Sequence, residues 1–241
     1  VIGIPAGVKI HSGVYAKRPI DAGRLIKNFL EGKVKRFSVT EVVDIDEEAF
    51  RDNIVRARLY GYMSVPDDRE FMQERKAGSA GKEAETTSNL AMYIAKEMKP
   101  DALYLIGSGS TTSAVTRQLG IEGTLLGVDA VCNKKLIGKD LTEKEITGLL
   151  NKYNTYQRYL IITIIGGQGH IFGRGNQQLS PSVLRLIPKS NIIIVSTPNK
   201  LSQLFGKSLI TDTGDVELDE TFKGYMPVTT GFGQSTMTRV G

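Results

Sequence analysis

The chain has 241 residues, of which 31 are Lys or Arg and 26 are Asp or Glu, so its formal net charge is +5. That excess is too small and too evenly spread to argue for a nucleic-acid partner. With 40% hydrophobic residues, the composition indicates a soluble globular protein of one large or two small domains, not a disordered or fibrous one. No apolar run approaches the roughly 20 residues that span a bilayer, and a single cysteine, Cys132, excludes an internal disulfide and a cysteine-based metal cluster. We therefore expect no membrane, no nucleic-acid partner and no structural metal site.

The first third of the chain predicts one helix and several strands. Residues 1–5 are typical of a strand, and a helix with one apolar face follows Pro19 and ends near Gly32. Two further extended segments cover residues 38–44 and 56–65. Residues 67–85 are dense in charge and poor in apolar side chains, which favours a mobile surface loop.

From residue 87 onward, helices and strands alternate. Apolar strands are predicted over residues 102–106, 124–131, 159–165 and 191–196. Helices are predicted between them, with start signals at Thr142 with Glu145, at Ser180-Pro181 and at Thr197-Pro198. Residues 208–240 read as short strands joined by turns at 213–215 and 231–233. The pattern predicts an α/β fold with mixed sheet layers, βαβ-type units, a largely parallel sheet covered on both faces and a strand-rich C-terminal segment.

A glycine- and hydroxyl-rich loop follows the strand at 102–106. Its glycines let backbone N–H groups approach an anion, its hydroxyls add donors, and the helix that follows adds partial positive charge. The candidate phosphate-binding residues are Gly107, Gly109, Ser110, Thr111 and Thr112. A tight strand-to-helix turn with Thr111 or Thr112 as the N-cap is an equally good interpretation.

A second glycine-rich loop follows the strand at 159–165 and carries five glycines within ten residues. Glycines cost backbone entropy wherever the fold does not need them, so this density favours a folded loop around a polar, phosphorylated ligand. A structural turn with a paired arginine is the alternative, and His170 is more typical of a structural residue than of a base. The candidate ligand-binding residues are Gly166, Gly167, Gln168, Gly169, Arg174, Gly175, Asn176 and Gln177.

The remaining candidates are weaker. Residues 197–200 place one lysine, Lys200, near a helix start. Nucleotide sites use carboxylates for ribose hydroxyls and magnesium, and Asp46, Glu47 and Asp129 have the best positions for such contacts. Most acidic side chains are nevertheless solvated or act as caps.

Five segments together resemble the ATP-NAD kinase-like family, and more narrowly the branch that includes the acetoin-catabolism X proteins. They are residues 3–9 (GIPAGVK), 107–112 (GSGSTT), 126–129 (LGVD), 166–169 (GGQG) and 173–178 (GRGNQQ). The resemblance extends over essentially the whole chain, and its most specific part is the segment 173–178. It implies an NAD kinase-like C-terminal region that uses ATP and Mg²⁺, with NAD as substrate.

The resemblance also matches individual residues of this chain to known motifs of NAD kinases. Ser110 and Thr111 match the Gly-Ser-Thr-Ala-Tyr motif of NAD kinases, whereas Thr112 and Ser113 replace its Ala-Tyr pair. The pair at residues 46–47 stands where NAD kinases carry an Asn-Glu or Asn-Asp pair on the ribose.

The Gly-Gly-Asp-Gly-Thr motif of NAD kinases, whose Asp serves as the base, does not occur here. In the family this motif precedes a segment that resembles residues 1–16. We therefore expect the chain to be the C-terminal portion of a longer protein, with the catalytic base upstream of Val1. Residues 1–32 are then expected to join a missing N-terminal kinase domain to a substrate- and nucleotide-binding domain over 33–241.

The sequence is consistent with three functions. The first is phosphorylation of NAD to NADP by the longer protein, with this chain inactive alone, as a cytoplasmic homo-oligomer that binds a small-molecule nucleotide. The second is a nucleotide-binding or regulatory module without kinase activity, which the departures at Thr112 and Ser113 favour. The third, a sugar-phosphate isomerase-like domain, rests on the loop 107–112 alone.

Overall fold

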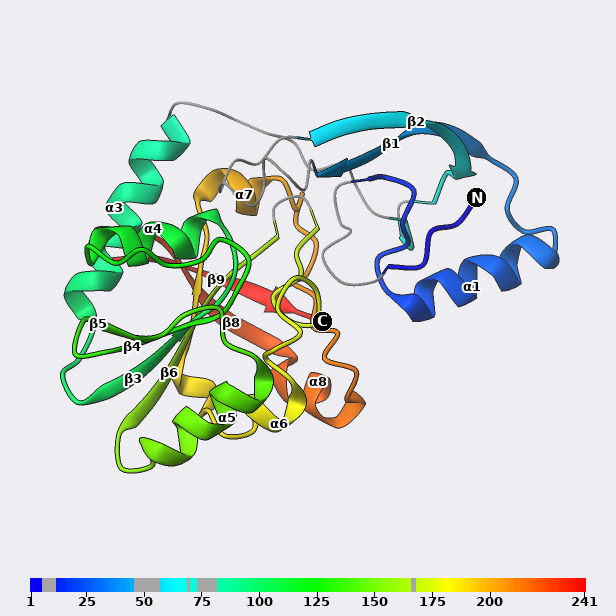
Figure 1. Ribbon diagram of the computed structural model, residues 1–241. Helices are drawn as coiled ribbons and strands as arrows, with labels where there is room; N and C mark the ends of the chain where they lie inside the picture. The colour runs from blue at the N-terminus through cyan, green and yellow to red at the C-terminus, as the bar shows by residue number, and fades with distance from the viewer. Residues whose placement is uncertain (6–11, 46–56, 69, 73–81, 166–167) are drawn as a thin grey trace. The chain divides into compact units, whose positions relative to one another are not determined.

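The computed structural model describes residues 1–5, 12–45, 57–68, 70–72, 82–165 and 168–241 (Figure 1). The chain forms two compact units, residues 1–77 and 78–241. The boundary follows residue 77 because helix α1 (Pro19–Leu30) shares a small core with strand β2 (Ala57–Pro66). The expected division of the longer protein after residue 32 stays a prediction.

The N-terminal unit contains α1 and an antiparallel ribbon of β1 (Phe37–Ile45) and β2. All three elements match the sequence prediction within two residues at their described ends. The predicted opening strand shortens to one bridge, between Gly3 and Tyr15. Among the described residues of this unit, one cluster of buried apolar side chains forms a core: Val14, Ala16, Ala22, Leu25, Val65 and Met72.

The C-terminal unit is built on a seven-stranded sheet of order β5-β4-β3-β6-β7-β8-β9. Its strands are β3 (Ala102–Ile106), β4 (Asp129–Cys132), β5 (Lys135–Gly138), β6 (Gln157–Thr163), β7 (Ile192–Val195), β8 (Gly224–Gly231) and β9 (Gln234–Val240). The four central strands β3, β6, β7 and β8 run parallel, and β4 and β9 pair antiparallel at their outer sides. The α/β prediction is confirmed, although the parallel part is limited to the centre of the sheet.

Helices cover both faces of this sheet. They are α3 (Lys82–Glu97), α4 (Ser110–Gln118), α5 (Glu143–Lys152), α6 (Pro181–Leu184), α7 (Pro198–Ser202) and α8 (Val216–Phe222), with a 3-10 turn at Lys189–Asn191. In Figure 1, α3 and α4 lie together on one side of the sheet, and α5 and α6 lie on the other. No helix in the described ranges has the length and apolar character that crossing a bilayer requires.

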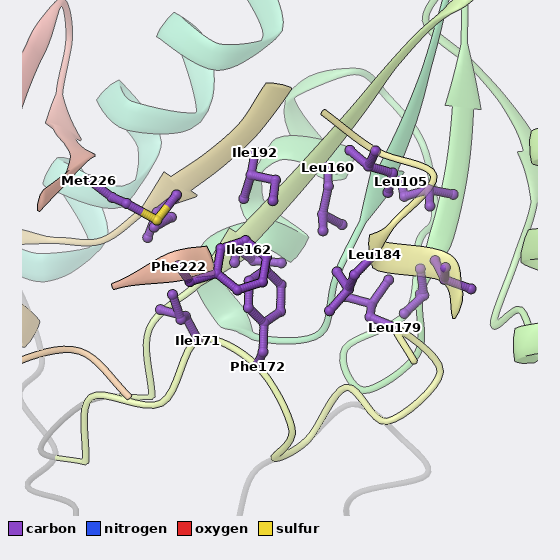
Figure 2. Close-up of a cluster of buried hydrophobic side chains, with 14 of the residues drawn as sticks. Leu105, Leu160, Ile162, Ile171, Phe172, Leu179, Leu184, Ile192, Phe222 and Met226 are labelled. Atoms are coloured by element: carbon purple, nitrogen blue, oxygen red, sulfur yellow. The ribbon is translucent and has the colours of Figure 1, made fainter. Parts of the chain in front are cut away.

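The side chains of the central strands alternate between two cores, as the period of a strand requires. Leu105, Leu160 and Ile162 point into the core shared with α5, α6 and α8 (Figure 2). Tyr104 and Ile161 point into the core shared with α3 and α4. Both faces of the sheet are therefore buried. The loops at the ends of its strands are the parts of this unit that can contact a ligand.

Three local predictions need correction. The strand predicted over 124–131 pairs only from Asp129 onward, because the preceding residues form a loop held by the Asp129 carboxylate. The segment 208–240 contains a helix, α8, that begins at the N-cap Asp215. Helix α3 begins at Lys82, inside the segment predicted as a charged loop.

Candidate functional site

Three loops follow the carboxyl ends of the parallel strands β3, β6 and β7. They are residues 107–112, here called the α4 loop, residues 168–178, the glycine loop, and residues 197–200, the α7 loop. Because β3, β6 and β7 are neighbours in the sheet and run parallel, their carboxyl ends meet at one edge. Open α/β sheets bind ligands at this edge.

Glycine is required at the turn of the α4 loop. Gly109 is the N-cap of α4 with a φ of 125°, and a Cβ atom there would lie 2.5 Å from Cγ2 of Thr163. The helix therefore begins at Ser110, and its N-cap, a glycine, makes no side-chain capping bond. The alternative with Thr111 or Thr112 as the N-cap is wrong, because both residues lie inside the helix.

The two threonines of this first turn have different partners. The Thr112 hydroxyl donates to the Gly109 carbonyl at 2.8 Å and so closes the turn. The Thr111 hydroxyl oxygen accepts a hydrogen bond from Nζ of Lys200 at 2.7 Å. The start of α4 therefore combines a lysine ammonium with the positive end of a helix dipole, an arrangement that favours an anion.

The glycine loop is anchored in the core by its own side chains. Ile171 and Phe172 are 1% and 0% exposed. The Phe172 ring packs against Phe222 with a centroid distance of 4.9 Å (Figure 2). A loop with two such anchors is folded, in agreement with the prediction that its glycines serve a fixed shape.

Asn176 fixes the tip of the glycine loop. Its Oδ1 accepts from the Gly173 amide at 3.1 Å, and its Nδ2 donates to the Ile171 carbonyl at 2.9 Å. Gly173 and Gly175 have backbone φ values of 88° and 72°, which residues other than glycine rarely adopt. Asn176 thus stabilises the loop that carries the predicted ligand-binding residues.

The α4 loop and the glycine loop are bonded to each other. The Ser108 hydroxyl donates to the Gly175 carbonyl at 2.5 Å. Arg174, next to Gly175, is only 5% exposed, and a guanidinium keeps its charge when buried. The second loop therefore brings a permanent positive charge into this part of the fold.

The α7 loop is tied to helix α3. Thr197 is the N-cap of α7 and accepts from the Lys200 amide at 3.3 Å. Its hydroxyl donates to Glu83 Oε1 at 2.8 Å, while Asn199 Nδ2 donates to Glu83 Oε2 at 2.7 Å. Lys200 thus lies between the first turns of α3 and α4.

The carboxylate of Asp129 holds its own loop together. Its Oδ1 accepts from the Thr124 hydroxyl at 2.9 Å and from the Asp140 amide at 3.0 Å. Its Oδ2 accepts from the Thr124 amide at 2.6 Å. These three bonds compensate for the burial of the Asp129 carboxylate, which is 1% exposed. Its suggested contact with ribose or metal stays a prediction.

The other predicted residues fall into two groups. Gln168 and Gly169 are buried at the start of the glycine loop, whereas Gln177 is exposed at its end. Four predicted residues lie outside the described ranges: Asp46, Glu47, Gly166 and Gly167. The backbone of His170 forms an isolated β-bridge with Ile210, and the residue is 1% exposed, in keeping with a structural role.

The comparisons with known proteins give one match. The family model described as the ATP-NAD kinase C-terminal domain matches residues 100–240, more than half of the chain. The chain belongs to the ATP-NAD kinase family. Searches of curated proteins and of solved structures found no match. The narrower likeness to the acetoin-catabolism X branch stays a prediction.

Membership of the ATP-NAD kinase family implies ATP and NAD, and the residues at the sheet edge suit such ligands. Lys200, the start of α4 and the hydroxyls of the α4 loop are all groups that bind phosphate. Within the described ranges no three His, Cys, Asp or Glu side chains gather as metal ligands. Protein-bound Mg²⁺ commonly relies on substrate phosphates and few carboxylates, so it fits a site of this kind when it enters with ATP.

Sequence reasoning missed Glu83 and undervalued Lys200. Glu83 falls in the charged segment predicted as a solvated loop, and it also precedes the part matched by the family model. Its partners Thr197 and Asn199 are more than 110 positions away, so no local pattern could reveal the contact. The N-cap signal at Thr197 followed by Pro198 was present and marked the right turn.

Proposed function

We propose that this chain is the nucleotide-binding domain of a kinase that phosphorylates NAD to NADP with ATP. The observation that carries the proposal is the 2.7 Å contact between Lys200 Nζ and the Thr111 hydroxyl. It holds a cation at the start of α4, beside two glycine-containing loops at the ligand-binding edge of the sheet. Membership of the ATP-NAD kinase family supports this reaction class.

In this proposal the residues of the chain bind and orient the substrate phosphates. Phosphoryl transfer depends mostly on positioning and on stabilisation of the charge on the transferred group. Lys200 and the N–H groups at the start of α4 supply positive charge, and the Thr111 hydroxyl directs the ammonium. Magnesium, when bound with ATP, neutralises phosphate charge. We assign no base among the described residues.

The test is an assay of the full-length protein. Incubated with NAD, ATP and Mg²⁺, it is expected to form NADP, detected by an NADP-specific dehydrogenase. Calorimetry with NAD and with ATP, each alone, separates binding from turnover. Absence of binding for both nucleotides would overturn the proposal.

One observation favours a nucleotide-binding module without kinase activity. The aromatic position of the Gly-Ser-Thr-Ala-Tyr motif is occupied by Ser113, whose hydroxyl accepts from Arg117 at 2.9 Å within α4. No tyrosine ring is present there to contact a ligand. This alternative predicts nucleotide binding with no NADP formed, and detection of NADP from purified full-length protein excludes it.

We also propose that the protein forms a homo-oligomer. Supporting this, one face of the β1–β2 ribbon exposes Phe37, Val39 and Tyr62 at 51%, 71% and 62%. Apolar side chains grouped on one face commonly mark interaction surfaces. Light scattering coupled to gel filtration tests the proposal, and a monomer at micromolar concentration contradicts it.

A further inference from the structure

We propose that Glu83 is a positioning residue that sets the place of Lys200 at the phosphate-binding edge of the sheet. The inference rests on the proposed function, because it assumes that Lys200 binds a nucleotide phosphate. Glu83 itself lies on α3, outside the residues matched by the family model.

Both carboxylate oxygens of Glu83 bond to the α7 loop. Oε1 accepts from the Thr197 hydroxyl at 2.8 Å, and Oε2 accepts from Asn199 Nδ2 at 2.7 Å. Hydrogen bonds to an ionised acceptor are about twice as strong as bonds between neutral groups. Thr197 is 1% exposed, so water competes little for its hydroxyl.

The Thr197 hydroxyl connects Glu83 to the backbone of Lys200. It donates its proton to Glu83 and accepts from the Lys200 amide at 3.3 Å. A hydroxyl has one proton, so the bond to Glu83 fixes its rotation and turns a lone pair toward that amide. Glu83 thereby supports the N-cap that holds Lys200 in its turn.

Helix α7 needs support of this kind because it is short. It spans Pro198–Ser202, five residues. Isolated helices of this length are unstable in water, since nucleation costs more than a single turn returns. Contacts from outside α7 therefore decide where the Lys200 side chain points.

The helices that carry Glu83 and Thr111, α3 and α4, pack into the same hydrophobic core. Helix α3 packs through Leu90 and Ile94, and α4 packs through Val115, into the same core on one face of the sheet. Lys200 is held by its amide through Thr197 and Glu83, and by its ammonium through Thr111. A phosphate oxygen can replace the neutral Thr111 hydroxyl as acceptor without movement of α7, since the bond to the anion is charge-assisted.

A double-mutant cycle in the full-length protein tests the inference, with NADP as the probe in calorimetry. The variants are Glu83→Ala, Lys200→Met and the double variant, and Glu85→Ala serves as control. Glu85 is an exposed carboxylate in the same first turn, so its removal changes the charge equally. Urea unfolding of each variant records stability separately.

Lys200→Met is expected to weaken NADP binding by about tenfold or more, as loss of a charge-assisted bond does. Glu83→Ala is expected to weaken it severalfold, with no further loss in the double variant beyond Lys200→Met alone. Glu83→Gln is expected to restore part of the affinity, because its amide oxygen still accepts a bond. Losses that multiply in the double variant, or wild-type affinity in Glu83→Ala, overturn the inference.

Hydrogen exchange gives a readout without ligand. In Glu83→Ala the amides of α7 are expected to exchange faster, while those of α4 are unchanged, and Glu85→Ala leaves both unchanged. If the wild-type protein binds no nucleotide, the proposed function fails and exchange alone decides the role of Glu83, with unchanged α7 exchange overturning it. If Glu83→Ala does not fold, Asn199→Ala, which removes one of the two bonds, replaces it in both measurements.

Discussion

The α4 loop and the glycine loop follow adjacent parallel strands and are both rich in glycine, yet they are built differently. The glycine loop is shaped by its own side chains, with Ile171 and Phe172 in the core and Asn176 across its tip. The α4 loop has its polar groups at a helix start, where Thr111 meets Lys200. The glycines of a loop therefore indicate its backbone conformation, whereas its hydroxyls and a nearby lysine indicate whether it can bind a phosphate.

The largest effect is expected at Gly173. A Cβ atom there would lie 1.7 Å from the backbone oxygen of Asp212, in addition to the unfavourable φ of 88°. Gly173→Ala is expected to lower the free energy of unfolding by more than about 3 kcal/mol or to prevent folding.

Gly175→Ala is the matched variant, since its φ is also positive but the nearest atom to its Cβ, Oγ of Ser108, is 3.9 Å away. We expect a cost of about 1 to 2 kcal/mol. Urea unfolding measures both variants. Equal losses would show that steric contact with Asp212 does not shape the glycine loop.

The next effect is expected at Asn176, which is 6% exposed. Asn176→Ala removes both bonds across the loop tip and leaves the Gly173 amide and the Ile171 carbonyl without that partner. The expected loss is about 2 kcal/mol in urea unfolding. Asn176→Asp keeps the acceptor but turns an oxygen toward the Ile171 carbonyl, and is expected to be no more stable than Asn176→Ala. A loss below about 0.5 kcal/mol in both variants would contradict the structural role.

Two threonines distinguish shape from chemistry within the α4 loop. Thr112→Val removes the bond to the Gly109 carbonyl and is expected to cost about 1 kcal/mol of stability. Thr111→Val removes the hydroxyl that accepts from the Lys200 ammonium. It is expected to weaken nucleotide binding and to leave the free energy of unfolding nearly unchanged. Urea unfolding and ATP calorimetry on both variants check this, and the reverse assignment would contradict it.

The smallest effect concerns the capping box of α5, which lies outside both loops and gives a reference for a local hydrogen bond. The Thr142 amide, and then its hydroxyl, hold the pKa of the Glu145 carboxyl below its usual value. A lowered pKa in the folded state gives stability that is present above the unfolded pKa and is lost as pH falls through the folded one. The stability difference between wild type and Glu145→Gln is therefore expected to shrink from pH 7 to pH 3. A difference that grows on acidification would contradict this.

Much of the fold could be predicted from sequence because its signals are local. The apolar run 102–106 is a strand with the predicted ends, and the pairs Thr142 with Glu145 and Ser180 with Pro181 start helices as predicted. Strand β5 was missed because it is short, with four residues. Helix α8 was missed although, with seven residues, it is longer than the predicted helices α6 and α7. The N-cap Asp215, with Leu218 and Phe222 four residues apart, was a readable sign of α8.

The site was only partly predictable, for a physical reason. Glycines and hydroxyls marked the α4 loop and the glycine loop, since backbone approach and hydrogen bonding need those residue types nearby in sequence. The contacts of Lys200 with Thr111 and of Glu83 with Thr197 join residues 89 and 114 positions apart. Such pairs depend on strand order, which a local pattern does not carry.

The most direct test of the central claim, that the carboxyl edge of the sheet binds nucleotide phosphates, is the affinity of the full-length protein for ATP and for NAD when Lys200 is changed to Met. Lys139→Met, at an exposed lysine, is the control for charge. We predict that Lys200→Met weakens at least one of the two nucleotides by about tenfold or more, with wild-type stability and with Lys139→Met unchanged. Wild-type affinity of Lys200→Met for both nucleotides would contradict the claim.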